Sequence, residues 1–188
     1  MNRFPLVFSL LACLALSALA AEVPRPAPEI SIALPDGKQA KASDYKGKVV
    51  VATFFLTTCP HCQKVIQTLN GVQRDLGPKG LQVMAGAMNA AEGASIPQFI
   101  QKFQPVYPLG AVDQISAGAY MQLSPMVRTF VPYMLIIDRK GVIRAQYTGG
   151  DPFLQDEAAQ DRNIREEVSK LLDEKAPGKS HTVARKNK

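Results

Sequence analysis

VVVATFFLTTCPHCQ, residues 49–63, joins an apolar run to two closely spaced cysteines. Residues 49–56 are rich in β-branched and aromatic side chains, which predicts a buried strand. After the cysteines, apolar residues recur at three- and four-residue steps up to Leu76, a pattern that predicts an amphipathic helix. The sequence therefore places Cys59-Pro60-His61-Cys62 where a strand passes into a helix.

This position favours a reactive sulfur at Cys59. Pro60 suits the first helical position, where its missing N–H would be unpaired in any case, so Cys59 becomes the N-cap. Its sulfur then faces free N–H groups and the positive end of the helix dipole, which favour the thiolate, the nucleophile of disulfide exchange. Cys62 lies on the same side of the turn and can close a short disulfide. His61 adds positive charge near the sulfur when it is protonated.

Two other interpretations of the cysteine pair are half of a zinc site and a static disulfide. Zinc needs a second pair of ligands, and the whole chain has only three Cys and two His. A disulfide between Cys59 and Cys62 closes too small a loop to stabilise a fold. A catalytic redox pair without a metal is therefore the better interpretation.

Composition predicts one globular domain with a sizeable core, since 46% of the 188 residues are hydrophobic and 20% are charged. Much of the net charge of +6 comes from residues 176–188, which hold four basic residues and no acidic one. We expect this segment to be a disordered basic tail, with contact to a membrane surface or a partner as the alternative. The domain itself has no charge excess that would indicate nucleic-acid binding.

The N-terminal residues 1–20, MNRFPLVFSLLACLALSALA, have the pattern of a secretory signal peptide: a basic start, an apolar stretch and a small-x-small cleavage site. The alternatives are an uncleaved membrane anchor and a lipoprotein modified at Cys13. Cleavage after residue 20 removes Cys13 and leaves only Cys59 and Cys62 in the mature chain. We therefore expect a periplasmic protein in an oxidising compartment.

The rest of the chain alternates strand and helix signals. A Pro-rich lead-in at 21–29 precedes a domain at 30–175. Within that domain the patterns predict an N-terminal hairpin, strands at 49–56 and 81–88, a helix–strand–helix excursion at 95–123, a hairpin of strands at 133–137 and 142–147, and a final helix from about 156. Strands separated by helices predict an α/β fold with a central mixed sheet covered on both faces.

A strand, Cys-x-x-Cys and a helix in this order resemble the thioredoxin superfamily. Phe54-Phe55 and Pro60-His61 are similar to DsbA-type periplasmic disulfide oxidants. The hairpin that ends in Tyr45-Lys46-Gly47-Lys48, together with the excursion between Cys62 and Pro132, resembles instead the TlpA/ResA-like, peroxiredoxin-related branch (redoxin, AhpC/TSA-related). The resemblance implies a thioredoxin-like fold and a thiol–disulfide oxidoreductase that needs no dissociable cofactor.

The resemblance also assigns roles to Val131-Pro132. In the superfamily the proline at this position is cis and lies against the active cysteines, and the backbone of the residue before it pairs with an extended substrate segment. The alternative is a trans proline that begins an edge strand. One departure from the pattern is Thr53, which stands where thioredoxin-type proteins often carry a buried acidic residue. Another is Thr58, which replaces the usual Trp.

The leading hypothesis is an exported enzyme that exchanges disulfides with protein thiols and disulfides, served by a membrane or periplasmic redox partner. The direction of electron flow is open. Pro60-His61 resembles an oxidant, whereas the TlpA-like features resemble reductants of cytochrome c maturation or copper-site assembly. One alternative is a thiol peroxidase, but Leu56 stands where peroxiredoxins need Thr or Ser. Another is a copper-binding assembly factor, but such carriers resemble a Cys-x-x-x-Cys with a distant His, and only His181 in the tail is left.

Overall fold

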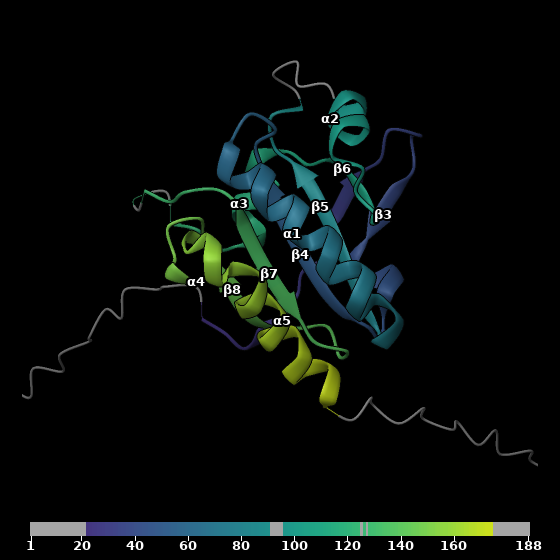
Figure 1. Cartoon of the computed structure of the whole chain (residues 1–188), viewed down its shortest axis with the longest axis vertical. Helices are drawn as coiled ribbons and strands as arrows, with labels where there is room; N and C mark the ends of the chain where they lie inside the picture. The colour runs from purple at the N-terminus through teal and green to yellow at the C-terminus, as the bar shows by residue number, and fades with distance from the viewer. Residues whose placement is uncertain (1–21, 91–95, 125, 127, 175–188) are drawn as a thin grey trace, which may run out of the picture.

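The computed structural model of the chain describes residues 22–90, 96–124, 126 and 128–174 (Figure 1). The predicted signal peptide at 1–20 and the predicted basic tail at 176–188 lie outside the described residues. Within the described part, no helix is both long and apolar enough to span a membrane.

One mixed sheet organises the described residues. Its strands are β1 (Arg25–Pro26), β2 (Ser31–Ala33), β3 (Gln39–Lys41), β4 (Val49–Phe55), β5 (Leu81–Ala87), β6 (Leu109–Ala111), β7 (Tyr133–Ile137) and β8 (Val142–Tyr147). They lie in the order β1-β8-β7-β4-β5-β6-β2-β3. The central strand β4 runs parallel to β5 and antiparallel to β7. The predicted mixed sheet is confirmed.

Helices cover both faces of this sheet. They are α1 (Pro60–Leu76), α2 (Ile96–Phe103), α3 (Gln114–Tyr120), α4 (Pro152–Gln155) and α5 (Glu157–Asp173), with short 3₁₀ turns at Ala42–Tyr45 and Gly77–Lys79. Figure 1 shows α1 and α5 crossing the sheet on the same side, and both contribute to one core cluster. A second cluster on the other face includes residues of β2 and α3.

Strand β4 shows why the sequence folds in this way. All seven of its residues are buried. Successive side chains of a strand point to opposite faces, so Val51 and Phe55 pack with α1 and α5, whereas Val50 and Phe54 pack with the second cluster. A strand that is apolar at every position needs cover on both faces, which is the arrangement found.

The elements around β4 follow the sequence patterns, with two differences. The hairpin of β2 and β3 and the α2-β6-α3 excursion are present as expected. However, Arg25 and Pro26, inside the expected lead-in, form β1 and pair with β8. The segment before the final helix also forms a short helix, α4, which meets α5 at a corner. Both features depend on contacts distant in sequence, which local patterns do not encode.

Candidate active site

The two cysteines lie at the junction of β4 and α1, as the sequence predicts. Cys59 is the N-cap of α1 with an extended backbone (φ −82°, ψ 116°), and Pro60 occupies the first helical turn. The Sγ of Cys59 accepts the backbone N–H of Cys62 at 3.3 Å. The first sulfur therefore meets an unpaired N–H of the helix N-terminus, where negative charge is stabilised. Both thiols are free in this structure.

The environments of the two sulfurs differ. Cys59 is partly exposed, whereas Cys62 is fully buried in the cluster beneath α1. Burial, followed by the hydrogen bond with Cys59, raises the pKa of Cys62 well above its ordinary value. Of the two sulfurs, that of Cys59 is therefore the one accessible from outside.

Thr53 occupies the position of the missing acidic residue. It is fully buried, and its hydroxyl donates to the backbone carbonyl of Tyr133 on β7 at 2.9 Å. Strand alternation places it on the same face as Val51 and Phe55, beneath α1. A hydroxyl at this place holds β4 to β7 but carries no charge, so it cannot accept the Cys62 proton as a carboxylate does.

His61 is anchored to the corner between α4 and α5. Its Nε2 lies 2.8 Å from the backbone carbonyl oxygen of Leu154. A carbonyl only accepts hydrogen bonds, so Nε2 carries a hydrogen and donates it. The buried side chain of Gln160 donates to the same oxygen at 2.7 Å. The sequence predicted a functional role for His61 but gave no indication of these two partners, which lie more than ninety positions away.

The Val131–Pro132 peptide bond is cis, as the family resemblance implied. Strand β7 begins at Tyr133, which pairs with Phe54 near the end of β4, so the predicted substrate-binding segment lies at the same end of the sheet as the cysteines. The backbone N–H of Gly149 donates to the carbonyl of Phe130 at 2.6 Å. A Cβ at position 149 would collide with the Val131 carbonyl, so only glycine lets the segment after β8 approach here.

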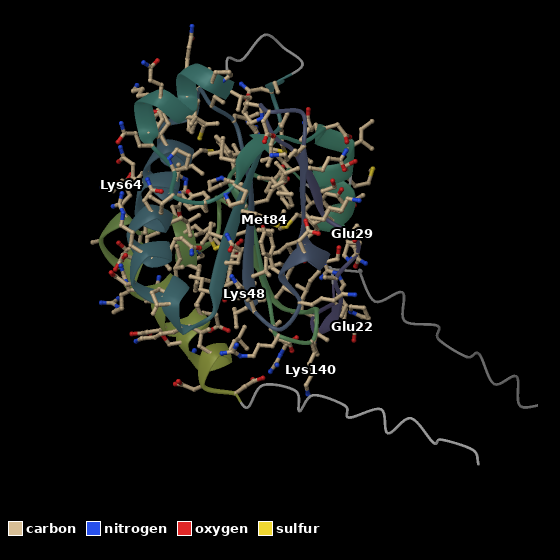
Figure 2. All side chains as sticks on the ribbon, turned by 90° about the vertical axis from the view of Figure 1, so that its right-hand side faces the viewer. Glu22, Glu29, Lys48, Lys64, Met84 and Lys140 are labelled. Carbon is tan, nitrogen blue, oxygen red and sulfur yellow. The ribbon has the colours of Figure 1, made fainter. Side chains whose placement is uncertain are left out.

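Two further observations concern metal binding and cavities in the described residues. Among them, no group of three or more His, Cys, Asp or Glu residues is arranged to hold a metal ion. A hollow of about 810 Å³ lies at the opposite end of β4, where its lining includes Tyr45, Lys48 and Lys140. Figure 2 shows Lys48 and Lys140 in the lower half of the molecule. The hollow does not include the cysteines, which lie at the other end of the strand.

Comparison with known proteins identifies the family. The Redoxin family model matches residues 22–161, which include the whole of β4, the cysteine pair and the cis-proline strand. The chain belongs to the Redoxin family. This redoxin is a thiol–disulfide oxidoreductase of the thioredoxin-like type, in agreement with the fold and enzyme class predicted from the sequence.

Individual relatives agree with this assignment. The thiol-disulfide oxidoreductase ResA of Bacillus thuringiensis subsp. konkukian is 24% identical over 129 residues, which cover 68% of this chain and 70% of the relative. The thioredoxin-like protein YneN of Bacillus subtilis is 26% identical over 125 residues, covering 65% and 69% of the two chains.

Solved structures show the same fold. A thiol:disulfide interchange protein of the thioredoxin family from Chlorobium tepidum superposes with a TM-score of 0.62 at 25% identity, covering 81% of this chain and 99% of the other. The thioredoxin domain of a thiol-disulfide oxidoreductase from Bacteroides vulgatus gives a TM-score of 0.62 at 18% identity and covers 80% and 97%.

Proposed function

We propose that this redoxin exchanges disulfides with protein substrates through Cys59 and Cys62. The observation that carries the proposal is the asymmetry of the pair. The Cys59 sulfur is partly exposed and accepts an N–H at the start of α1, whereas Cys62 is buried with a raised pKa. Such a pair has one sulfur suited to attack and one suited to resolution.

The exchange has two steps. The Cys59 thiolate attacks one sulfur of a substrate disulfide, so that this S–S bond breaks, a mixed disulfide forms and the second substrate sulfur leaves as a thiolate. Cys62 then loses its proton and attacks Cys59, which closes the Cys59–Cys62 disulfide and releases the first substrate sulfur. Two electrons pass from the cysteine pair to the substrate, and the reverse sequence oxidises a substrate dithiol.

Substrate placement is assigned to Val131 and Pro132. The backbone of Val131 pairs with an extended segment of the substrate, as an added strand does at a sheet edge. The support is that Pro132 directly precedes Tyr133, which pairs with Phe54 at the end of β4 that leads to Cys59. Pro60 and His61 then belong to the site through their positions in the first turn of α1.

We further propose that the enzyme acts after export, as a periplasmic protein. The support is the signal-like pattern of residues 1–20. In this proposal, cleavage leaves the lead-in at 21–29, the domain at 30–175 and the basic segment at 176–188. A membrane or periplasmic redox partner must restore the pair after each turnover, since one cycle changes its oxidation state.

The direction of exchange depends on the reduction potential of the pair. Potentials of related Cys-x-x-Cys proteins span about 150 mV, so the fold does not fix the direction. We propose a relatively oxidising pair, because the N-cap position stabilises reduced Cys59 as the thiolate, and a stabilised reduced form makes the disulfide a stronger oxidant. The supply of electrons by the partner can still drive it as a reductant.

Equilibration of the mature protein with glutathione buffers tests this function. Mass spectrometry of the quenched protein is expected to show a Cys59–Cys62 disulfide that forms reversibly, with a midpoint closer to that of DsbA than to that of thioredoxin. Peroxide consumption is measured in parallel against Cys59→Ser. Rapid peroxide turnover without exchange of glutathione disulfide would favour the peroxidase alternative and contradict the proposal.

A further inference from the structure

Gln160 is a fully buried polar side chain between three elements. It lies in the first turns of α5. Its Oε1 accepts the hydroxyl of Thr68 on α1 at 3.1 Å, and its Nε2 donates to the carbonyl of Leu154 on α4 at 2.7 Å. A buried amide with both ends hydrogen-bonded holds its partners in place, because breaking either bond leaves a polar group without water.

The Leu154 carbonyl needs donors from elsewhere in the chain. Helix α4 has only four residues, and the last carbonyls of any helix have no partner within it. The N–H of Ala158, four residues on, donates instead to the side chain of Asp156. The oxygen is thus available, and both His61 and Gln160 donate to it.

These two donors fix the tautomer of His61. The Nε2 of His61 lies 2.8 Å from an oxygen that can only accept, so it carries a hydrogen and cannot also accept one from the Nε2 of Gln160, 3.5 Å away. His61 keeps its hydrogen on Nε2 in the neutral ring as well as in the charged one.

Thr68 and His61 lie seven positions apart on α1, so they share one face of the helix. Thr68 bonds to the Gln160 amide and His61 bonds to the carbonyl that this amide holds. Helix α1, which begins with the cysteine pair, is therefore joined to the α4–α5 corner by two contacts, one from His61 and one from Thr68. Gln160 takes part in the second and shares the carbonyl of the first.

We propose that Gln160 is a positioning residue for the redox motif. It holds the Leu154 carbonyl against His61, which keeps the imidazole in the Nε2–H form beside the start of α1. The proposal rests on the function proposed for Cys59 and Cys62. Without Gln160 the imidazole is no longer held beside the start of α1, and the reduced pair loses the stabilisation that it draws from the positioned ring. The disulfide then becomes less oxidising.

Gln160→Met is the main test, because it keeps the volume and removes both hydrogen bonds. The equilibrium constant of the pair with glutathione is expected to shift toward a less oxidising disulfide by about threefold to tenfold, the net worth of one hydrogen bond. Asn163→Leu is the matched control. Asn163 also lies on α5 and donates to a neighbouring carbonyl of α4, that of Phe153, at 3.1 Å, but this bond does not involve His61. The equilibrium constant of Asn163→Leu with glutathione is expected to equal that of the parent protein.

Two further measurements separate positioning from a general loss of stability. In a His61→Ala background, Gln160→Met is expected to cause no additional shift, since the two residues act through one contact. Nitrogen NMR of His61 is expected to show protonated Nε2 in the parent protein and a mixture of tautomers in Gln160→Met. If Gln160→Met does not fold, Thr68→Val removes one of the two bonds of Gln160 from a less buried position.

The proposal is overturned if Gln160→Met leaves both the equilibrium constant and the nitrogen shifts of His61 unchanged. It is equally overturned if Asn163→Leu shifts the constant as much, or if the effect persists without His61. Failure of the proposed function has a different signature, because the parent protein would then exchange no disulfide with glutathione while the NMR of His61 still reports on its position.

Discussion

At the scale of single residues, the decisive contrast is between the two sulfurs. They are three positions apart, yet one caps a helix at the surface and the other is buried beneath it. The spacing and the following proline were enough to predict this, because both act within one turn. The partners of His61 were not predictable, since Leu154 contributes a backbone atom and Gln160 is one of many polar residues on an amphipathic helix. The sequence does not indicate that Gln160 is buried, because burial depends on how α5 packs against α1 and α4.

The raised pKa of Cys62 leads to a pH dependence of the resolving step. Thr53 supplies no carboxylate, so Cys62 is protonated at neutral pH and its thiolate fraction grows about tenfold per pH unit below that pKa. Decay of a preformed mixed disulfide, followed by rapid quenching and mass spectrometry, is expected to accelerate with pH throughout the neutral and alkaline range. Cys62→Ser, in which the mixed disulfide persists, is the control. A decay rate that levels off near neutral pH would contradict this account.

At the scale of elements, the period of the apolar residues predicted β4, α1 and the strands at 133–137 and 142–147. These segments carry their own pattern of burial, and turn residues mark their ends. The pattern could not predict β1, whose two residues become a strand only by pairing with β8. It also missed α4, because four residues are too few to show a period. The turn between β7 and β8 was predicted from Asp138-Arg139-Lys140-Gly141. Its first residue, Asp138, contributes to the stability of the fold.

The Asp138 carboxylate accepts the backbone N–H of Lys140 at 2.8 Å and of Val142 at 3.0 Å, and it pairs with Arg144 at 3.1 Å. Burial alone would raise the pKa of Asp138, but these donors outweigh it and lower the pKa. A lowered pKa stabilises the fold above the unfolded value of about 4 and loses this effect as the pH falls through the folded value.

Asp138→Ala is therefore expected to lower the free energy of unfolding at pH 7 by about 1.5–3 kcal/mol, the worth of hydrogen bonds to a charged group. Urea unfolding is compared with that of Asp36→Ala, which alters an exposed ion pair in another turn. The difference between Asp138→Ala and the parent protein is expected to shrink in acid. A difference that stays constant with pH would show that the charge of Asp138 contributes nothing.

At the scale of the whole molecule, the cysteine pair lies at one end of the sheet and a set of structural hydrogen bonds lies at the other. The redox pair, the cis-proline segment and the α4–α5 corner lie at the end where β4 passes into α1. At the other end, Arg139 donates to the carbonyls of Gly47 and Leu172, which joins the β7–β8 turn to the start of β4 and the end of α5. Because the proposed chemistry is confined to one end, substitutions of the partly exposed Cys59 and His61 there are expected to alter exchange without unfolding the protein.

Trapping of mixed disulfides tests the central claim most directly. Cys62→Ser, expressed with residues 1–20 intact, is expected to accumulate mixed disulfides with substrate proteins of the cell envelope, visible as reducible high-mass bands. Cys59→Ser is the matched control and is expected to trap none, because the remaining sulfur is buried. If Cys59→Ser accumulates the complexes and Cys62→Ser does not, Cys62 is the attacking sulfur, and the assignment of roles at the start of α1 is wrong.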